Sequence, residues 1–211
     1  TELIGYSDAN YATCTDTRRS ISGRVFMLCG GAISWASQMQ KVVATSSAEA
    51  EYIAVSAAAH ECLFLRKICS AMFGQDLKQM PPTTIWEDNE GCRKWCENPL
   101  NHAKMKHIDV AYHFVREQQT EFRTLVVKWI DGTDNPADIG TKPLPAPAFE
   151  KFLRQMMQLG DRSLKTTCPT STTDECAAKM QQSDTAEGKT DTSISQTHVA
   201  DESKATAEII C

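Results

Sequence analysis

Five short apolar segments, separated by turn-forming residues, predict the strands of one sheet. They are rich in branched or aromatic side chains, which is typical of strands. Gly30 and Gly31 fall between the second and third segments and predict a tight hairpin turn, so the first three strands form an antiparallel meander. The segments are residues 3–6, 24–28, 32–36, 83–86 and 125–130, with 41–44 as a candidate extension of the third.

Apolar residues recur at helical spacing in the segment 48–73, which predicts the longest helix of the chain. Ser46 and Ser47 before this segment offer an N-cap, and Gly74 after it offers a C-cap. A meander followed by alternating helices and strands predicts an α/β fold with one mixed sheet and helices on its faces. The shorter predicted helices cover residues 90–96, 108–120 and 148–159, with a further helix start at 137–138.

The composition changes sharply near Gly160 and predicts two regions. All aromatic residues precede position 160, whereas 161–211 is rich in Ser and Thr and carries more acids than bases. Such a segment buries too little apolar surface to offset the entropy of ordering. We therefore expect a folded domain over 1–160 and a disordered acidic tail over 161–211.

Charge and cysteine content exclude several classes of protein. The net charge of −5 excludes binding to nucleic acid through bulk positive charge alone. There is no apolar run of the roughly 18 residues that a membrane span needs, and no signal-peptide pattern. Nine cysteines, an odd number, favour reduced thiols. We therefore expect an intracellular protein, cytoplasmic or nuclear, that is neither secreted nor bound to a membrane.

Four acidic residues lie at the predicted ends of strands or starts of helices: Asp8, Glu51, Asp88 and Asp138. Ligands gather beyond the carboxyl ends of strands in α/β sheets, so neighbouring first and fourth strands would bring Asp8 and Asp88 together. Carboxylates that share a small site require cations, and their hard oxygen atoms favour Mg²⁺ or Mn²⁺. The alternative is that each acid only caps or solvates its own element.

A second candidate metal site is disfavoured by its spacing. Cys92, Cys96, His102 and His107 superficially suggest zinc, but the cysteine pair lies too close to the first histidine for a finger.

Seven sequence blocks, in order over about residues 3–159, carry a resemblance to a known family. They resemble the ribonuclease H domain of copia-type LTR retrotransposon Pol polyproteins, and the tail has no counterpart in that pattern. The blocks are YSDANYA (6–12), RSISG (19–23), GAISW (31–35), VATSSAEAEY (43–52), EDN (87–89), KHIDVAYHFVRE (106–117) and ADIGTKPL (137–144).

The resemblance implies a ribonuclease H-like five-stranded mixed sheet, of strand order 3-2-1-4-5, flanked by helices. It also implies hydrolysis of the RNA strand of RNA–DNA hybrids during reverse transcription, with two Mg²⁺ ions for which Mn²⁺ can substitute. The catalytic and metal-binding residues implied are Asp8, Glu51, Asp88 and Asp138. Glu49 competes with Glu51 for the helix position, and only one of them can face the site because they lie about 200° apart around a helix.

The implied partners are the hybrid and the reverse transcriptase domain of the same polyprotein. A hybrid is recognised through its backbone and 2′-hydroxyls rather than its base edges. The candidate substrate-binding residues are Asn89, Arg19, Arg93, Lys104, Lys106 and His107.

Other interpretations remain beside this one. The loop 131–136 lacks the mobile histidine of cellular ribonucleases H. The main alternative is a catalytically weak or silent module of the same fold, from a decayed or captured element, that binds nucleic acid or supports a reverse transcriptase. The spacing of acids disfavours an integrase, and Asn10 disfavours an exonuclease with Asp-x-Glu in its first strand. We expect the four tryptophans to lie in the core.

Overall fold

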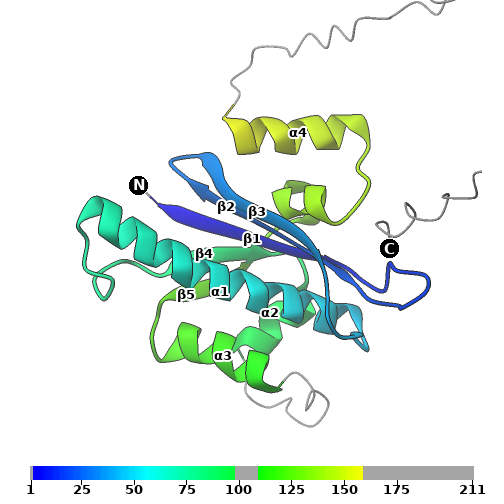
Figure 1. Cartoon of the computed structure of the whole chain (residues 1–211), viewed down its shortest axis with the longest axis horizontal. Helices are drawn as coiled ribbons and strands as arrows, with labels where there is room; N and C mark the ends of the chain where they lie inside the picture. The colour runs from blue at the N-terminus through cyan, green and yellow to red at the C-terminus, as the bar shows by residue number, and fades with distance from the viewer. Residues whose placement is uncertain (1, 98–108, 159–211) are drawn as a thin grey trace, which may run out of the picture. The chain divides into compact units, whose positions relative to one another are not determined.

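The computed structural model describes residues 2–97 and 109–158 and contains a five-stranded sheet with helices on both faces (Figure 1). The strands lie in the order β3-β2-β1-β4-β5. Their bounds are β1 Leu3–Asn10, β2 Ile21–Leu28, β3 Gly31–Met39, β4 Thr83–Glu87 and β5 Leu125–Trp129. The helices are α1 Ser47–Phe73, α2 Glu90–Glu97, α3 Asp109–Thr120 and α4 Ala146–Met157, with 3₁₀ turns η3 Gly132–Asp134 and η4 Pro136–Gly140.

The sheet is mixed, with an antiparallel half and a parallel half. β1 pairs antiparallel with β2, which pairs antiparallel with β3, whereas β1–β4 and β4–β5 are parallel pairs. The parallel pairs are joined through helices, as parallel connections require. This order and these directions are those of a ribonuclease H-like fold, so the expected fold class is confirmed.

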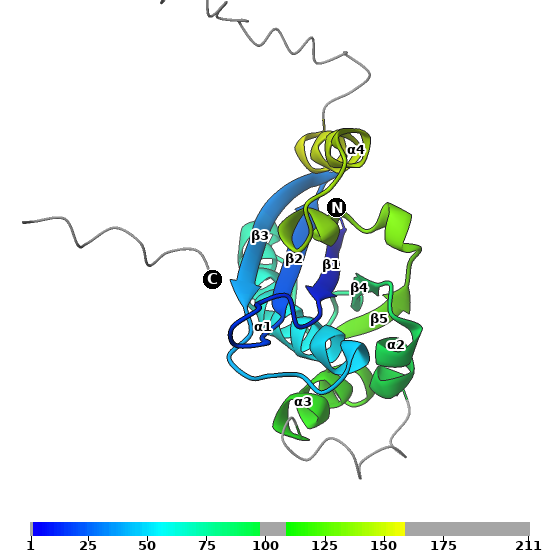
Figure 2. The ribbon, with the colours of Figure 1, turned by 90° about the vertical axis from the view of Figure 1, so that its right-hand side faces the viewer.

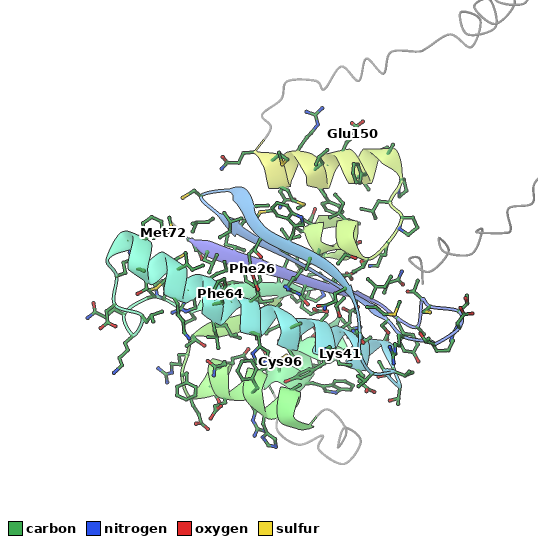
Figure 3. The ribbon with its side chains drawn as sticks, in the orientation of Figure 1. Phe26, Lys41, Phe64, Met72, Cys96 and Glu150 are labelled. Atoms are coloured by element: carbon green, nitrogen blue, oxygen red, sulfur yellow. The ribbon has the colours of Figure 1, made fainter. Side chains whose placement is uncertain are left out.

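An apolar core lies on each face of the sheet. On one face, α1, α2 and α3 cover a cluster that includes Phe26, Tyr52 and Ile85, all fully buried. On the other face, η4 and α4 cover a smaller cluster around Val25 and Met27. Figure 2 shows α1 and α3 on the opposite side of the sheet from α4, and Figure 3 labels Phe26 between the sheet and α1. The alternation of side chains along β2 thus supplies both cores.

Helix α1 begins and ends at residues whose chemistry favours those positions. The Ser46 hydroxyl accepts a hydrogen bond from Glu49 N, and the Glu49 carboxylate accepts one from Thr45 N. This reciprocal arrangement satisfies backbone donors at the helix start. Gly74 adopts the left-handed conformation with φ of 64°, and its N–H donates to Ser70 O. The expected long helix is confirmed, with its start one residue earlier.

Several local expectations were wrong. β1 continues past Asp8 to Asn10 because it pairs with β2 along that whole length. The hairpin turn takes its positive φ values at Cys29 and Gly30, while Gly31 already belongs to β3. Residues 41–44 do not extend β3. Two tryptophans are exposed rather than buried, Trp35 by 66% and Trp129 by 50%, because they lie on the edge strands β3 and β5.

Within the described ranges, none of the helices is both long and apolar enough to cross a membrane. The predicted tail over 161–211 lies outside the described residues, so its disorder and the boundary at residue 160 stay predictions.

Candidate metal centre and active site

Asp8 and Asp88 are brought together by the parallel pairing of β1 with β4. Tyr6 lies opposite Trp86 in the register, so Asp8 and Asp88, two residues further along each chain, are level with each other. Asp8 is fully buried, and Asp88 is partly exposed. The expectation that the two aspartates meet at this end of the sheet is therefore met, although Asp8 lies inside β1 rather than at its end.

Asp138 reaches the same place from the 3₁₀ turn η4, where a regular helix was expected. The turn is fastened to β1 by Asn135, whose Nδ2 donates to Ser7 O at 2.8 Å and whose Oδ1 accepts from Ala137 N. It packs directly on β2 at Gly23, the residue opposite Asp8, where a Cβ atom would meet Ala137 O at 2.7 Å. A glycine in the RSISG block thus lets the turn approach Asp8.

Glu51, and not Glu49, faces the aspartates from α1. The Glu49 carboxylate is used in the helix cap at Thr45. Glu51 is 7% exposed and close enough to Asp8 and Asp88 for their charges to act on it. The two glutamates point in different directions because they are two residues apart on a helix.

The acids form two overlapping groups. One oxygen atom from each of Asp8, Asp88 and Asp138 lies within 4.8 Å of the others, and the same holds for Glu51, Glu87 and Asp88. All four predicted acids therefore converge, with Asp88 common to both groups.

Burial and mutual repulsion perturb the acidity of this cluster. Burial, followed by repulsion from Asp8 and Asp88, raises the pKa of Glu51 to about 9. Burial, followed by repulsion from Asp8, raises the pKa of Asp88 to about 6. Burial also raises the pKa of Asp138, despite its hydrogen bond to Lys142. Without a divalent cation the cluster therefore retains protons near neutral pH, and a bound cation would favour the ionised carboxylates.

Lys142 enters the cluster from the segment after η4. Its Nζ donates to Asp138 Oδ1 at 2.8 Å and to Asp8 Oδ1 at 3.1 Å. Burial opposes the charged form, but the bonds to Asp138 and Asp8 raise the pKa of Lys142 above its ordinary value. The neighbouring Thr141 hydroxyl donates to the other oxygen of Asp8, Oδ2. Sequence reasoning assigned no role to Lys142, although its spacing of four residues from Asp138 was a signal for an ion pair.

Glu87 is a second acid that sequence reasoning missed. It is fully buried, and burial followed by repulsion from Glu51 raises its pKa. Within the described part of the chain, its Oε2 and the Oε2 of Glu51 have no hydrogen-bond partner. The only sequence signal was its position beside Asp88 at the end of a strand.

The predicted substrate-binding residues have varied surroundings. Asn89 Oδ1 accepts from Cys92 N in the first turn of α2. Arg19 lies in the loop that leads from β1 to β2. Arg93 forms ion pairs with Glu90 and Glu97 of its own helix. Lys104, Lys106 and His107 lie outside the described residues.

The described residues give no support for the zinc site that the sequence already disfavoured. Cys92 and Cys96 are fully buried in the apolar core beside α1, and His102 and His107 lie outside the described residues.

The residues present fit a divalent metal ion. The cluster offers carboxylate oxygens, the donors that Mg²⁺ and Mn²⁺ prefer. The buried Glu51 Oε2, which has no hydrogen-bond partner among the described residues, is an unused ligand atom in the cluster. Asp8, Glu51, Asp88 and Asp138 could therefore hold such an ion.

Comparison with known sequences identifies relatives, although no family model matches the chain. It is 39% identical over 148 residues to the retrovirus-related Pol polyprotein from transposon TNT 1-94 of Nicotiana tabacum. It is 40% identical over 154 residues to the Pol polyprotein from transposon RE2 of Arabidopsis thaliana. These matches cover 70% and 73% of this chain but only 11% and 10% of the relatives, so the chain spans about a tenth of their length.

Solved ribonucleases H are similar at lower identity. LC11-RNase H1, isolated from compost, is 19% identical, with a TM-score of 0.47 over 72% of this chain and 98% of that chain. The N-terminal ribonuclease H domain of rv2228c from Mycobacterium tuberculosis is 12% identical, with a TM-score of 0.49 over 72% of this chain and 96% of that chain. The fold assignment rests on the strand order and directions described above.

Proposed function

We propose that this chain, a homologue of one segment of the retrovirus-related Pol polyproteins of transposons, hydrolyses the RNA strand of RNA–DNA hybrids. The observation that carries the proposal is the convergence of Asp8, Glu51, Asp88 and Asp138 at one end of a ribonuclease H-like sheet. Four carboxylates in one partly buried site match the needs of metal-assisted phosphodiester hydrolysis better than those of a capping or structural role.

The proposed cofactor is a pair of Mg²⁺ ions, with Mn²⁺ as a substitute, held by the same four acids. When bound, such ions activate a water molecule and stabilise the charge that develops on the phosphate. The chain itself contributes rigid placement of the ligands. Asp8 and Asp88 are fixed by strand pairing, Glu51 by a capped helix, and Asp138 by a turn fastened through Asn135.

The proposed substrate is bound through its backbone, in keeping with the shape of A-form duplexes. LC11-RNase H1 has been solved in complex with an RNA/DNA hybrid. We propose Asn89, Arg19, Arg93, Lys104, Lys106 and His107 as contacts. Arg93 would have to exchange its ion pairs with Glu90 and Glu97 for contacts with phosphate.

The proposed context is reverse transcription of a copia-type retrotransposon, with the reverse transcriptase domain of the same polyprotein as partner. Such a partner would supply electrostatic attraction for the hybrid, which a chain of net charge −5 has little of. The expected location is a cytoplasmic virus-like particle or the nucleus.

The test is cleavage of a hybrid labelled separately on each strand, in Mg²⁺ and in Mn²⁺. We expect cleavage of the RNA strand alone, and its loss both in EDTA and in Asp88→Asn. Asp134→Asn is the matched control, because Asp134 is exposed and pairs with Lys151 outside the cluster. Absence of cleavage in both metals by the correctly folded chain, alone and fused to a reverse transcriptase, would overturn the proposal and favour a binding module.

A further inference from the structure

The buried carboxylate of Asp8 already has a partner on each of its oxygens. Thr141 donates its hydroxyl to Oδ2, and Lys142 donates from Nζ to Oδ1 at 3.1 Å. Asp8 is fully buried, so the contacts of its oxygens lie within the protein. A cation shared by Asp8 and Asp138 would compete with the Lys142 ammonium, which already donates to an oxygen of each acid.

Lys142 is the partner that is free to leave. Its side chain is 36% exposed, whereas Thr141 is 6% exposed. The Lys142 backbone N–H donates to Asp138 O, so the main chain at this position is held in the turn while the long side chain can rotate into solvent. Thr141 has a short side chain and lacks such a route.

The positive charge of Lys142 is a second reason to expect that its side chain moves when a divalent cation binds. Its ammonium bridges Asp8 and Asp138, two of the carboxylates assigned to the metal. Among the ion pairs of the described residues, it is the only cation paired with a member of the acid cluster. An ammonium and a divalent cation on the same oxygens repel each other at close range.

We propose that Lys142 is an internal counter-ion, which neutralises Asp8 and Asp138 before metal binds and which a divalent cation must displace. The acid cluster then remains compact without metal, because a positive charge of the chain itself offsets part of the repulsion. The same charge competes with the metal, so it lowers the apparent affinity for Mg²⁺. This inference rests on the metal site of the proposed function and adds a residue that tunes it.

Mg²⁺ and Mn²⁺ binding to the full chain, measured by isothermal titration calorimetry without nucleic acid, tests this inference. We expect Lys142→Met and Lys142→Gln to bind Mg²⁺ about tenfold more tightly than wild type, which corresponds to about 1.4 kcal/mol of lost competition. Lys142→Arg keeps the charge and should retain the wild-type affinity. Lys151→Met is the matched control, because Lys151 pairs with Asp134 outside the cluster.

Thermal unfolding supplies a second readout. The metal-free Lys142→Met and Lys142→Gln variants should melt below wild type, and saturating Mg²⁺ should raise their melting temperature by more than it raises that of wild type. Near-UV circular dichroism identifies a variant that has lost its fold, in which case the other neutral variant decides the question.

The outcomes separate this inference from the proposed function. Unchanged or weaker Mg²⁺ binding in the neutral variants, or equally tight binding by Lys142→Arg, overturns the counter-ion role and leaves the metal site intact. Failure of every variant, wild type included, to bind either metal saturably overturns the metal site and the counter-ion role together. If Lys142→Met and Lys142→Gln bind Mg²⁺ but wild type does not, the Lys142 ammonium prevents metal binding, which supports the counter-ion role.

Discussion

Gly23→Ala is expected to damage the active site more than it damages the fold. Gly23 lies on β2 opposite Asp8, and its Cα faces the turn that carries Asp138. An added Cβ would lie 2.6 Å from Thr141 Cγ2 and 2.7 Å from Ala137 O. The optimal separation of non-bonded carbon atoms is about 3.5–4.0 Å, so the turn would have to move away from β2 by roughly 1 Å.

The size of the effect follows from this displacement. Overpacking of this kind costs about 1–3 kcal/mol of unfolding free energy, which a domain of this size can tolerate. A misplacement of about 1 Å in a catalytic constellation costs about 100-fold in rate. We therefore expect Gly23→Ala to stay folded at 25 °C while its cleavage of a hybrid falls about 100-fold.

Gly31→Ala is the matched control, because it also adds a methyl group to a strand glycine. Its Cβ would come no closer than 3.9 Å to the nearest atom, so we expect wild-type stability and cleavage. Urea unfolding and cleavage rates should be measured on both variants at equal protein concentration. Wild-type cleavage by Gly23→Ala would refute the reasoning, because the turn would then not need its present position to place Asp138.

Three further results are expected from the acid cluster and its supports. Because the pKa of Asp88 is raised to about 6 and that of Glu51 to about 9, Mg²⁺ binding at pH 7.5 should release protons. The binding should weaken as the pH falls from about 9, and more steeply below about 6. Calorimetry in buffers of different ionisation enthalpy measures this release, and a signal independent of the buffer would contradict it. The raised pKa of Glu87 means that the contribution of this one group to stability is fully present below pH of about 4.5, the ordinary pKa of a glutamate, and is lost as the pH rises through the folded-state pKa. Metal-free Glu87→Gln should therefore gain unfolding free energy over wild type as pH increases from 4.5 to 8. If urea titrations show that the difference in unfolding free energy between the two proteins is independent of pH, ionisation of Glu87 is not its cause. Asn135→Ala should lose about 1–3 kcal/mol of unfolding free energy, because Ser7 O loses its buried hydrogen-bond donor. A loss below about 0.5 kcal/mol in urea unfolding would contradict the structural role of this amide.

Much of the fold could be predicted because local patterns and global architecture agree. The apolar segments predict all five strands, and Ser46 and Gly74 bracket the long helix with the chemistry that helix ends require. Strand ends were less predictable: β1 extends to Asn10 because its partner strand offers hydrogen bonds there, which is a property of the pair rather than of either segment.

The identities of the four acids were likewise accessible from the sequence, through their positions and through the resemblance to a known family. Their environment was not. The pairing of Lys142 with Asp8 spans 134 residues, and no periodicity along the chain encodes a contact of that length. Glu87 could not be assigned to the acid cluster from the sequence, because strand alternation predicts the face of the sheet on which it lies but not the residues it contacts there.

The sequence by itself therefore determined the elements, their order and the candidate acids, since each depends on residues near one another along the chain. Tertiary structure decided that Gly23 makes room for the turn and that Glu51 faces the cluster. It also decided that the Lys142 ammonium pairs with both Asp8 and Asp138. These features depend on distances between elements that meet only after folding, where a single methyl group or ammonium changes what the site can hold.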